Sequence, residues 1–207
     1  EVNKNAIAEV VKNHPLCVLV TRKKNGGKGK ALADGVRKAD ELGLTHVLQI
    51  DSDGQHDAER VAHFVEVSKK NPDAIICAYP EYDESAPKHR VNGRTIANAW
   101  IHTVTLSKQI KDGMIGFRIY PVAPYVKLLN SHAIIDARMG YDIDILVRLF
   151  WKNVPVICES VKVTYPVDGV SNFRVVRDNA RISLTYARLF LGMIVRLPIL
   201  IYRKVKR

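Results

Sequence analysis

The chain has 207 residues, of which 47% are hydrophobic and 26% charged, and this composition excludes a disordered or collagen-like protein. The length suits one domain with a sizeable core, with or without an appendage. The three cysteines are odd in number and far apart in the sequence, which indicates a reducing compartment and argues against a disulfide framework or a metal cluster.

Positive charge is concentrated at the C-terminal end of the chain. The net charge is +11, and nine Lys or Arg residues with one Asp between Arg174 and Arg207 give that segment a charge of +8, leaving +3 for the first 173 residues. This asymmetry predicts an anionic surface as the partner of the tail. We therefore divide the chain into a domain over 1–173 and a basic tail over 174–207.

Predicted strands and helices alternate along the domain. Apolar, β-branched runs are separated by stretches with helical spacing, a pattern typical of βαβ units. It predicts an α/β fold with a largely parallel sheet and a ligand site at the carboxyl edge of the strands. The predicted strands are 16–21, 46–50, 74–79 and 154–165, and the predicted helices are 1–15, 29–43, 57–72, 95–106, 141–153 and 179–204.

The strand predicted over 46–50 leads directly into the acidic turn Asp-Ser-Asp-Gly-Gln. Alternate residues of an extended segment point the same way, so the carboxylates of Asp51 and Asp53 can face one divalent cation, with Gln55 adding a neutral oxygen. Oxygen ligands suit Mg²⁺ or Mn²⁺ holding a substrate diphosphate. The alternative is an Asp-Gly turn with solvated carboxylates.

Glycines flank Lys28 in the segment NGGKGKAL (25–32), just before a predicted helix. The free amides and the dipole of a helix N-terminus favour anions, so this segment is a candidate phosphate site. It is not a Walker A loop, because no Ser or Thr follows the Gly-Lys pair and the glycine spacing differs. The alternative is a surface loop without a ligand.

Five motifs in order resemble the inverting glycosyltransferases of family two, in particular the branch of polyprenyl-phosphate mannosyl- and glucosyltransferases. The resemblance implies a GT-A fold: a Rossmann-like, mostly parallel sheet flanked by helices, here followed by a C-terminal amphipathic helix. The family begins with a strand, a helix and a second strand whose acidic end contacts the base, so we expect an N-terminal truncation. The motifs are NGGKGKALADGVRKA (25–39), VLQIDSDGQHD (47–57), DGMIGFRIYP (112–121), MGYDIDILVRLFWKN (139–153) and VTYPVDGVSNFR (163–174).

The resemblance also implies roles for individual residues. Asp51 would contact the nucleotide-sugar, and Asp53 and Gln55, with Asp51, would hold Mg²⁺ or Mn²⁺. His56 would lie near the diphosphate. Permanently charged guanidinium groups can clamp phosphates. The candidate nucleotide-sugar-binding residues are Lys28, Asp51, Asp53, Arg94 and Arg118.

An inverting transfer to a hydroxyl needs a carboxylate to take the proton, whereas a phosphate acceptor is already an anion. The candidates are Asp112, Asp142 and Asp144. On a helix, Asp142 and Asp144 diverge by about 200°, so they cannot both face the site. Asp144 stands where the family usually has Glu, which shortens its reach by one methylene. Asn172 stands where some relatives have a histidine.

The tail predicts an amphipathic helix. Residues 181, 188, 196 and 203 are all arginine and fall on one narrow stripe, while nearly everything else from Leu189 to Tyr202 is apolar. We find no uninterrupted apolar run long enough for a spanning helix, and Arg196 with a kink at Pro198 favours the membrane interface. The alternative is a helix packed on the domain. Nucleic acid is not an expected partner, since no recognition motif accompanies the charge.

Together these features predict a metal-dependent inverting glycosyltransferase. It would move a sugar from a nucleotide diphosphate-sugar to a lipid or polyprenyl-phosphate-type acceptor, as a cytoplasmic, peripheral protein on the inner face of the plasma membrane. The alternatives are a nucleotidyltransferase, which also uses a carboxylate-metal site on a related sheet, and a non-catalytic module that keeps the fold and binds a membrane or a partner.

Overall fold

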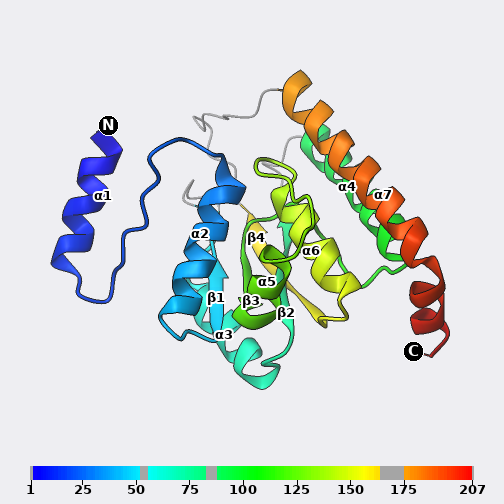
Figure 1. Cartoon of the computed structure of the whole chain (residues 1–207), viewed down its shortest axis with the longest axis horizontal. Helices are drawn as coiled ribbons and strands as arrows, with labels where there is room; N and C mark the ends of the chain where they lie inside the picture. Colours follow the sequence, from blue (N-terminus) through cyan, green and yellow to red (C-terminus); the bar gives the residue numbers. More distant parts are fainter. Residues whose placement is uncertain (1, 52–55, 83–87, 164–174, 207) are drawn as a thin grey trace.

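The computed structural model describes residues 2–51, 56–82, 88–163 and 175–206, and within them the fold is α/β with one four-stranded sheet (Figure 1). The strands lie in the order β1-β3-β2-β4. They are β1 (His46–Gln49), β2 (Ile75–Tyr82), β3 (Arg118–Pro121) and β4 (Val156–Val163). The helices are α1 (Val2–Asn13), α2 (Lys28–Glu41), α3 (Arg60–Lys70), α4 (Lys88–Thr105), α5 (Val122–Leu129), α6 (Tyr141–Trp151) and α7 (Val175–Lys206).

The sheet is mixed, which corrects the prediction of a largely parallel one. β1, β2 and β4 share one direction, but β3 is inserted antiparallel between β1 and β2, so β2–β4 is the one parallel ladder of the described sheet. The reason is the path after α4: residues 106–117 bring the chain back to the carboxyl end of β1, where Arg118 pairs with Gln49. β3 therefore begins at the edge where the site lies.

Helices cover both faces of the sheet, and alternate residues of β2 point to opposite sides. Ile76 and Ala78 face α3, whose Phe64 stacks on Phe117 at 4.5 Å between ring centroids. Ile75 and Cys77 face the larger cluster formed with α2, α5 and α6. Two separate apolar cores result, one on each face of the sheet.

Helix α6 lies at the centre of the larger core. Every residue from Tyr141 to Trp151 except Arg148 is buried, because the sheet lies on one side and α4 and α7 lie on the other. The Trp151 indole donates to the carbonyl of Val104 at 2.9 Å and so ties α6 to α4. An 11-residue helix buried on all sides holds its first-turn carboxylates in fixed positions.

Helix α7 packs one face on α4 and α6, as Figure 1 shows. It extends through Pro198, and its last turns point in a different direction from the rest. By length and composition it could cross a membrane, a property found for no other helix of the described residues and not expected from the sequence. Its buried hydrophobic residues recur at helical spacing: Ile182, Tyr186, Leu189, Met193 and Leu200.

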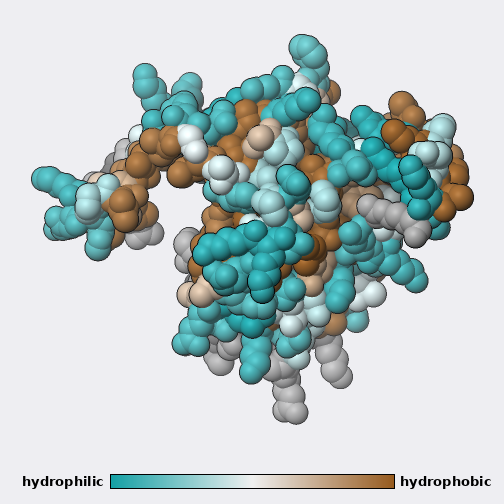
Figure 2. Space-filling model, turned by 90° about the horizontal axis from the view of Figure 1, so that it is seen from below, coloured by the Kyte–Doolittle hydropathy of each residue, from teal (hydrophilic) through white to brown (hydrophobic). Residues whose placement is uncertain are grey.

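Residues 16–21, predicted as a strand, form no strand. They lie in an arm between α1 and α2, where Leu16 is 97% exposed and Val18 is 53% exposed. β1 is one of the two edge strands of the described sheet, and no strand pairs with residues 16–21 to complete a ladder within the described ranges. Figure 1 shows the arm standing away from the domain, and Figure 2 shows apolar surface along it.

Two leucines on α7 test how much its packing stabilises the domain. Leu189 is fully buried, whereas Leu191 is 64% exposed. We expect Leu189→Ala to lower the free energy of unfolding by about 2–5 kcal/mol, because it removes buried methyl groups and leaves a cavity. Leu191→Ala is the control and should change it by less than about 0.5 kcal/mol. Denaturant unfolding measures both, and equal effects would show that α7 is not docked as described.

Candidate active site

One lysine lies between two carboxylates at the carboxyl edge of the sheet. The Lys28 ammonium is 2.7 Å from an oxygen of Asp51 and 2.9 Å from an oxygen of Asp142. Asp51 follows β1, Lys28 begins α2, and Asp142 lies in the first turn of α6. Residues predicted from three separate motifs thus form one cluster, which we call the Lys28 cluster.

The approach of α2 to α6 brings Lys28 to Asp142. Gly29 lies against Tyr141, and a Cβ at position 29 would come within 2.4 Å of the tyrosine ring. The Gly29 amide also donates to the carbonyl of Ala137 at 3.0 Å. Only a residue without a side chain permits this contact, which explains one of the glycines beside Lys28.

A second glycine makes room for Asp51. A Cβ on Gly116 would lie 2.2 Å from an oxygen of the Asp51 carboxylate, so that carboxylate packs directly on the backbone of the loop that precedes β3. Gln49 completes the arrangement, because its side-chain amide donates to Asp142 at 2.7 Å. Neither residue was predicted for the site. A polar side chain within the apolar run HVLQI was the available signal, since buried amides need partners.

The charges in this cluster stabilise one another. Burial raises the pKa of Asp51, but His56 and Lys28 lower it more strongly, and the pKa falls from 3.8 to about 2. Lys28, at 2.7 Å, is the closer partner, since the His56 ring nitrogen is 3.9 Å from the carboxylate. Burial lowers the pKa of Lys28, and the nearby Asp142 and Asp51 raise it more, so the group stays protonated.

Arg118 lies behind the cluster rather than on its surface. It is fully buried, and its guanidinium donates to the main-chain carbonyl of Asp142 at 2.8 Å and to the Tyr120 hydroxyl at 3.0 Å. The structure does not bring it to a position where a solvent-exposed phosphate could reach it. Its contacts hold the first turn of α6 on β3, so Arg118 positions Asp142.

Asp112 and Arg94 form a separate pair. One oxygen of Asp112 accepts hydrogen bonds from the amides of Met114 and Ile115 at 2.9 and 2.8 Å, and the other lies 3.3 Å from Arg94. Asp112 is 1% exposed. Its carboxylate is therefore committed to shaping the loop that carries Gly116, and the structure does not join this pair to the Lys28 cluster.

Asp144 points away from Asp142, as the helical spacing predicts. Its oxygens accept from the amide of Asp136 at 2.8 Å and from the Arg148 guanidinium. Burial raises its pKa, against the opposing effect of Arg148. The structure therefore places Asp142, and not Asp144, in contact with Lys28.

The residues predicted to hold a metal are only partly described. Asp53 and Gln55 lie outside the described residues, and the described residues contain no cluster of three His, Cys, Asp or Glu side chains suited to a metal. Asp51 supplies carboxylate oxygens immediately before 52–55, and its present partner is the cation of Lys28. Carboxylate oxygens are the ligand type that Mg²⁺ and Mn²⁺ prefer, and the Asp51 carboxylate already has a cation as its partner. The chemistry of Asp51 therefore suits either metal.

The family model for glycosyl transferase family 2 matches residues 3–130, more than half of the chain. The chain belongs to this family. The match covers Lys28, Asp51 and the loop through Gly116, so the Lys28 cluster lies largely within the part that defines the family 2 domain. A search of curated protein sequences found no match to the chain.

Solved structures of glucosyl-3-phosphoglycerate synthase from Mycobacterium tuberculosis have a similar fold. One has a TM-score of 0.60 at 13% identity and covers 92% of this chain and 64% of that chain. Two complexes of the same enzyme each have a TM-score of 0.58, with 85% of this chain and 56% of that chain covered. One is a complex with phosphoglyceric acid, at 14% identity. The other is a complex with Mn²⁺ and uridine-diphosphate-glucose, at 13% identity. This family 2 chain thus spans under two thirds of their length. The similarity confirms a GT-A-like fold with a mixed sheet and a long C-terminal helix.

The lowered pKa of Asp51 predicts a pH-dependent contribution to stability. A carboxyl whose folded-state pKa is depressed stabilises the fold above its unfolded pKa, and loses that contribution as the pH falls through the folded value. Here the window runs from about 4 down to about 2. We expect the difference in unfolding free energy between the native protein and Asp51→Asn to shrink by about 1–2 kcal/mol across it, allowing for solvent screening.

Denaturant unfolding at a series of pH values measures this difference. Asp73→Asn is the control, because Asp73 is exposed and forms no ion pair within the described residues. A pH dependence shared by both variants is therefore not a property of the Lys28 cluster. A difference for Asp51→Asn that does not change between pH 6 and pH 2 would contradict the ion pair with Lys28.

Proposed function

We propose that the chain is a metal-dependent inverting glycosyltransferase that takes a hexosyl group from a nucleotide diphosphate-sugar. The observation that carries the proposal is the Lys28 ammonium held between Asp51 and Asp142 at the carboxyl edge of the sheet. Ligands of open α/β sheets bind at this edge. Family membership supports glycosyl transfer, and the similar Mycobacterium tuberculosis enzyme that binds Mn²⁺ and uridine-diphosphate-glucose supports the donor class and the metal.

The chemistry requires the leaving diphosphate to be stabilised. The acceptor oxygen attacks the anomeric carbon, the bond from that carbon to the β-phosphate oxygen breaks, and negative charge develops on the nucleoside diphosphate. A protonated Lys28 can neutralise part of this charge. Asp51, with Asp53 and Gln55 from outside the described residues, would hold Mg²⁺ or Mn²⁺, which supplies further neutralisation at the diphosphate.

Asp142 is the carboxylate we assign as general base. Of the three candidates it alone contacts Lys28, since the Asp112 and Asp144 oxygens are occupied by backbone amides and arginines. When a diphosphate binds Lys28, the ammonium has a competing anionic partner. The Asp142 oxygen that it contacts is then available to take a proton from an acceptor hydroxyl.

We infer a lipid or polyprenyl-phosphate-type acceptor and a location on the cytoplasmic face of the plasma membrane. The support is α7, a 32-residue basic helix with apolar side chains exposed on its outer face. A peripheral helix of this kind would keep the domain near acceptors in the bilayer. This part of the proposal concerns the acceptor alone and stands separately from donor binding.

Donor binding tests the proposed function directly. We expect calorimetric titration with UDP- and GDP-sugars to show binding of one of them that requires Mn²⁺. Lys28→Met should weaken it about 10–100-fold, because a charged hydrogen-bonding group contributes about 1.5–3 kcal/mol. Lys30→Met is the matched control, since Lys30 is exposed on the same helix. No binding of any nucleotide-sugar by the folded protein would favour the non-catalytic alternative.

Turnover of the Asp142→Asn and Asp144→Asn variants tests the general base. With a hydroxyl acceptor we expect Asp142→Asn to lower kcat by about 10²–10⁴-fold while donor affinity changes little. Asp144→Asn should mainly lower the melting temperature, because Asp144 binds Arg148 and a backbone amide inside the core. If Asp142→Asn keeps full turnover, no base is needed and the acceptor is already an anion.

A further inference from the structure

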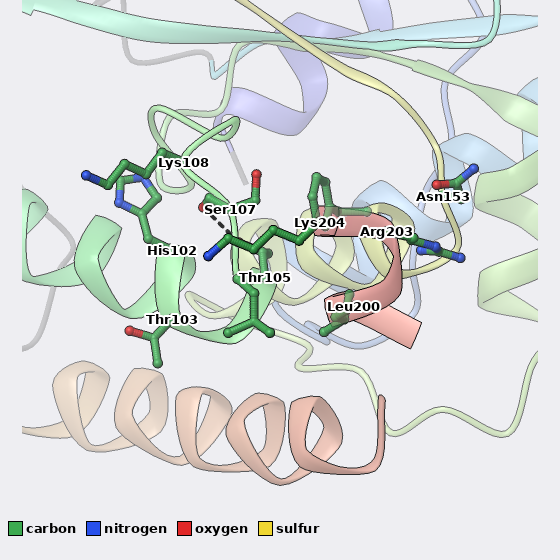
Figure 3. A pocket seen from close by; sticks show the side chains of 11 residues that line it. His102, Thr103, Thr105, Ser107, Lys108, Asn153, Leu200, Arg203 and Lys204 are labelled. Atoms are coloured by element: carbon green, nitrogen blue, oxygen red, sulfur yellow. Dashed lines mark hydrogen bonds between the residues drawn. The ribbon is translucent and has the colours of Figure 1, made fainter. Parts of the chain in front are cut away.

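A cavity of about 550 Å³ lies at the far end of the molecule from the Lys28 cluster. It is open to solvent on one side and is bordered by the ends of α4, α6 and α7, as Figure 3 shows. The lining residues are His102, Thr103, Thr105, Leu106, Ser107, Lys108, Phe150, Asn153, Leu200, Arg203 and Lys204.

The cavity combines apolar and cationic surfaces. Leu106, Phe150 and Leu200 supply apolar contacts, whereas Lys108, Arg203 and Lys204 supply positive charge. No acidic side chain is among the lining residues described by the structure. The cavity therefore matches a ligand that carries both a negative charge and an apolar portion.

The two lysines are available to such a ligand. Arg203 is already engaged, since its guanidinium donates to the carbonyl of Trp151 at 2.9 Å at the end of α6. Within the described ranges, neither Lys108 nor Lys204 forms an ion pair. Figure 3 shows the Lys204 side chain extended across the cavity toward α4.

The cavity is separate from the donor site. Asp142 lies in the first turn of α6, and Phe150 lies near its end. At 1.5 Å per residue the two positions are about 12 Å apart along the helix axis. A ligand in the cavity would therefore leave the Lys28 cluster unoccupied.

The exposed apolar face of α7 lies on the other side of the helix from the cavity, because the packed residue Leu200 is the one that lines the cavity. Opposite its packed face, α7 exposes apolar side chains that continue to its C-terminal end, and Figure 2 shows apolar surface on that side of the molecule. The basic residues Arg203, Lys204 and Lys206 follow in the last turns. The exposed set includes Leu184, Leu191, Ile194, Val195, Ile201, Tyr202 and Val205.

We propose that this cavity binds the phosphate headgroup of an anionic membrane lipid, taken up as a single molecule between α4, α6 and the packed face of α7. The phosphate would lie between Lys108 and Lys204, and the first part of the lipid tail would contact Leu106, Phe150 and Leu200. A free phosphate would use the lysines but not the apolar floor, so the lipid has the better fit. The site is independent of the glycosyl-transfer proposal.

Soluble short-chain lipids separate a headgroup site from general membrane attraction. We expect calorimetric titration of the protein with dihexanoyl phosphatidylglycerol, below its micelle concentration, to show saturable binding. Glycerol 3-phosphate, which lacks the tail, and dihexanoyl phosphatidylcholine, which lacks the net charge, should bind at least tenfold more weakly. Equal binding of glycerol 3-phosphate would identify a free-anion site and overturn the lipid assignment.

Two variants distinguish the cavity from surface charge. Lys108→Gln with Lys204→Gln should weaken phosphatidylglycerol binding about 25-fold, since each lysine contributes about fivefold near an anionic headgroup. Ser107→Trp, at a half-buried lining position, places a bulky side chain in the cavity without changing charge and should also abolish binding. Lys127→Gln, an exposed lysine on α5, is the control and should bind as the native protein does.

The midpoint of thermal unfolding serves as the second readout for these variants. It should stay close to the native value in both, which shows that they are folded whether or not the chain binds a nucleotide-sugar. If Ser107→Trp binds phosphatidylglycerol normally, the attraction comes from exposed charge and the cavity is not the site. No binding of any short-chain lipid by the native protein would likewise overturn the proposal.

Discussion

The arrangement of the site depends on one constraint, that two carboxylates close together need a cation between them. Lys28 supplies that cation, and its two short contacts join α2, the end of β1 and the start of α6. Asp142 is almost fully buried, so removing the lysine would leave a buried charge without its partner. The glycines at 29 and 116 follow from the same constraint, since each clears the space that lets a charged side chain reach its partner.

Helix α6 connects the two ends of the domain. Its first turn carries Asp142, fixed from behind by Arg118 and from the side by Gln49. Its last turn borders the basic cavity and receives Arg203 from α7. Because α6 is buried along its length, the Lys28 cluster at one end and the basic cavity at the other keep a fixed separation.

The sequence predicted the fold best where local periodicity decides the structure. Six elements lie close to their predicted ranges: β1, β2, β4, α2, α3 and α6. In each of them the spacing of apolar residues in the sequence matches the period of the element that forms. β3 and α5 were missed, since a four-residue strand followed directly by a helix carries little periodic signal. Residues 16–21 have the composition of a strand but lack a partner, and pairing is a property of the whole sheet.

The candidate site was predicted in part. The motifs placed Lys28, Asp51 and three candidate bases, Asp112, Asp142 and Asp144, at one edge of an α/β sheet, where strand ends and helix starts meet. The structure brings Asp142 of these three to Lys28. The positions of Asp112 and Arg118 could not be predicted, since a carboxylate that caps a loop and an arginine buried behind a helix have the same sequence signature as residues facing a ligand.

The open side of β1 has a consequence for how this chain behaves in solution. An edge strand presents a row of unpaired amides and carbonyls, and the exposed leucine and valines of the neighbouring arm offer the apolar side chains that a new strand would need. Two copies brought together at high concentration would therefore tend to join through their sheets. Charged or proline substitutions in the arm would be the rational way to keep such a protein monodisperse, without touching α7 or the Lys28 cluster.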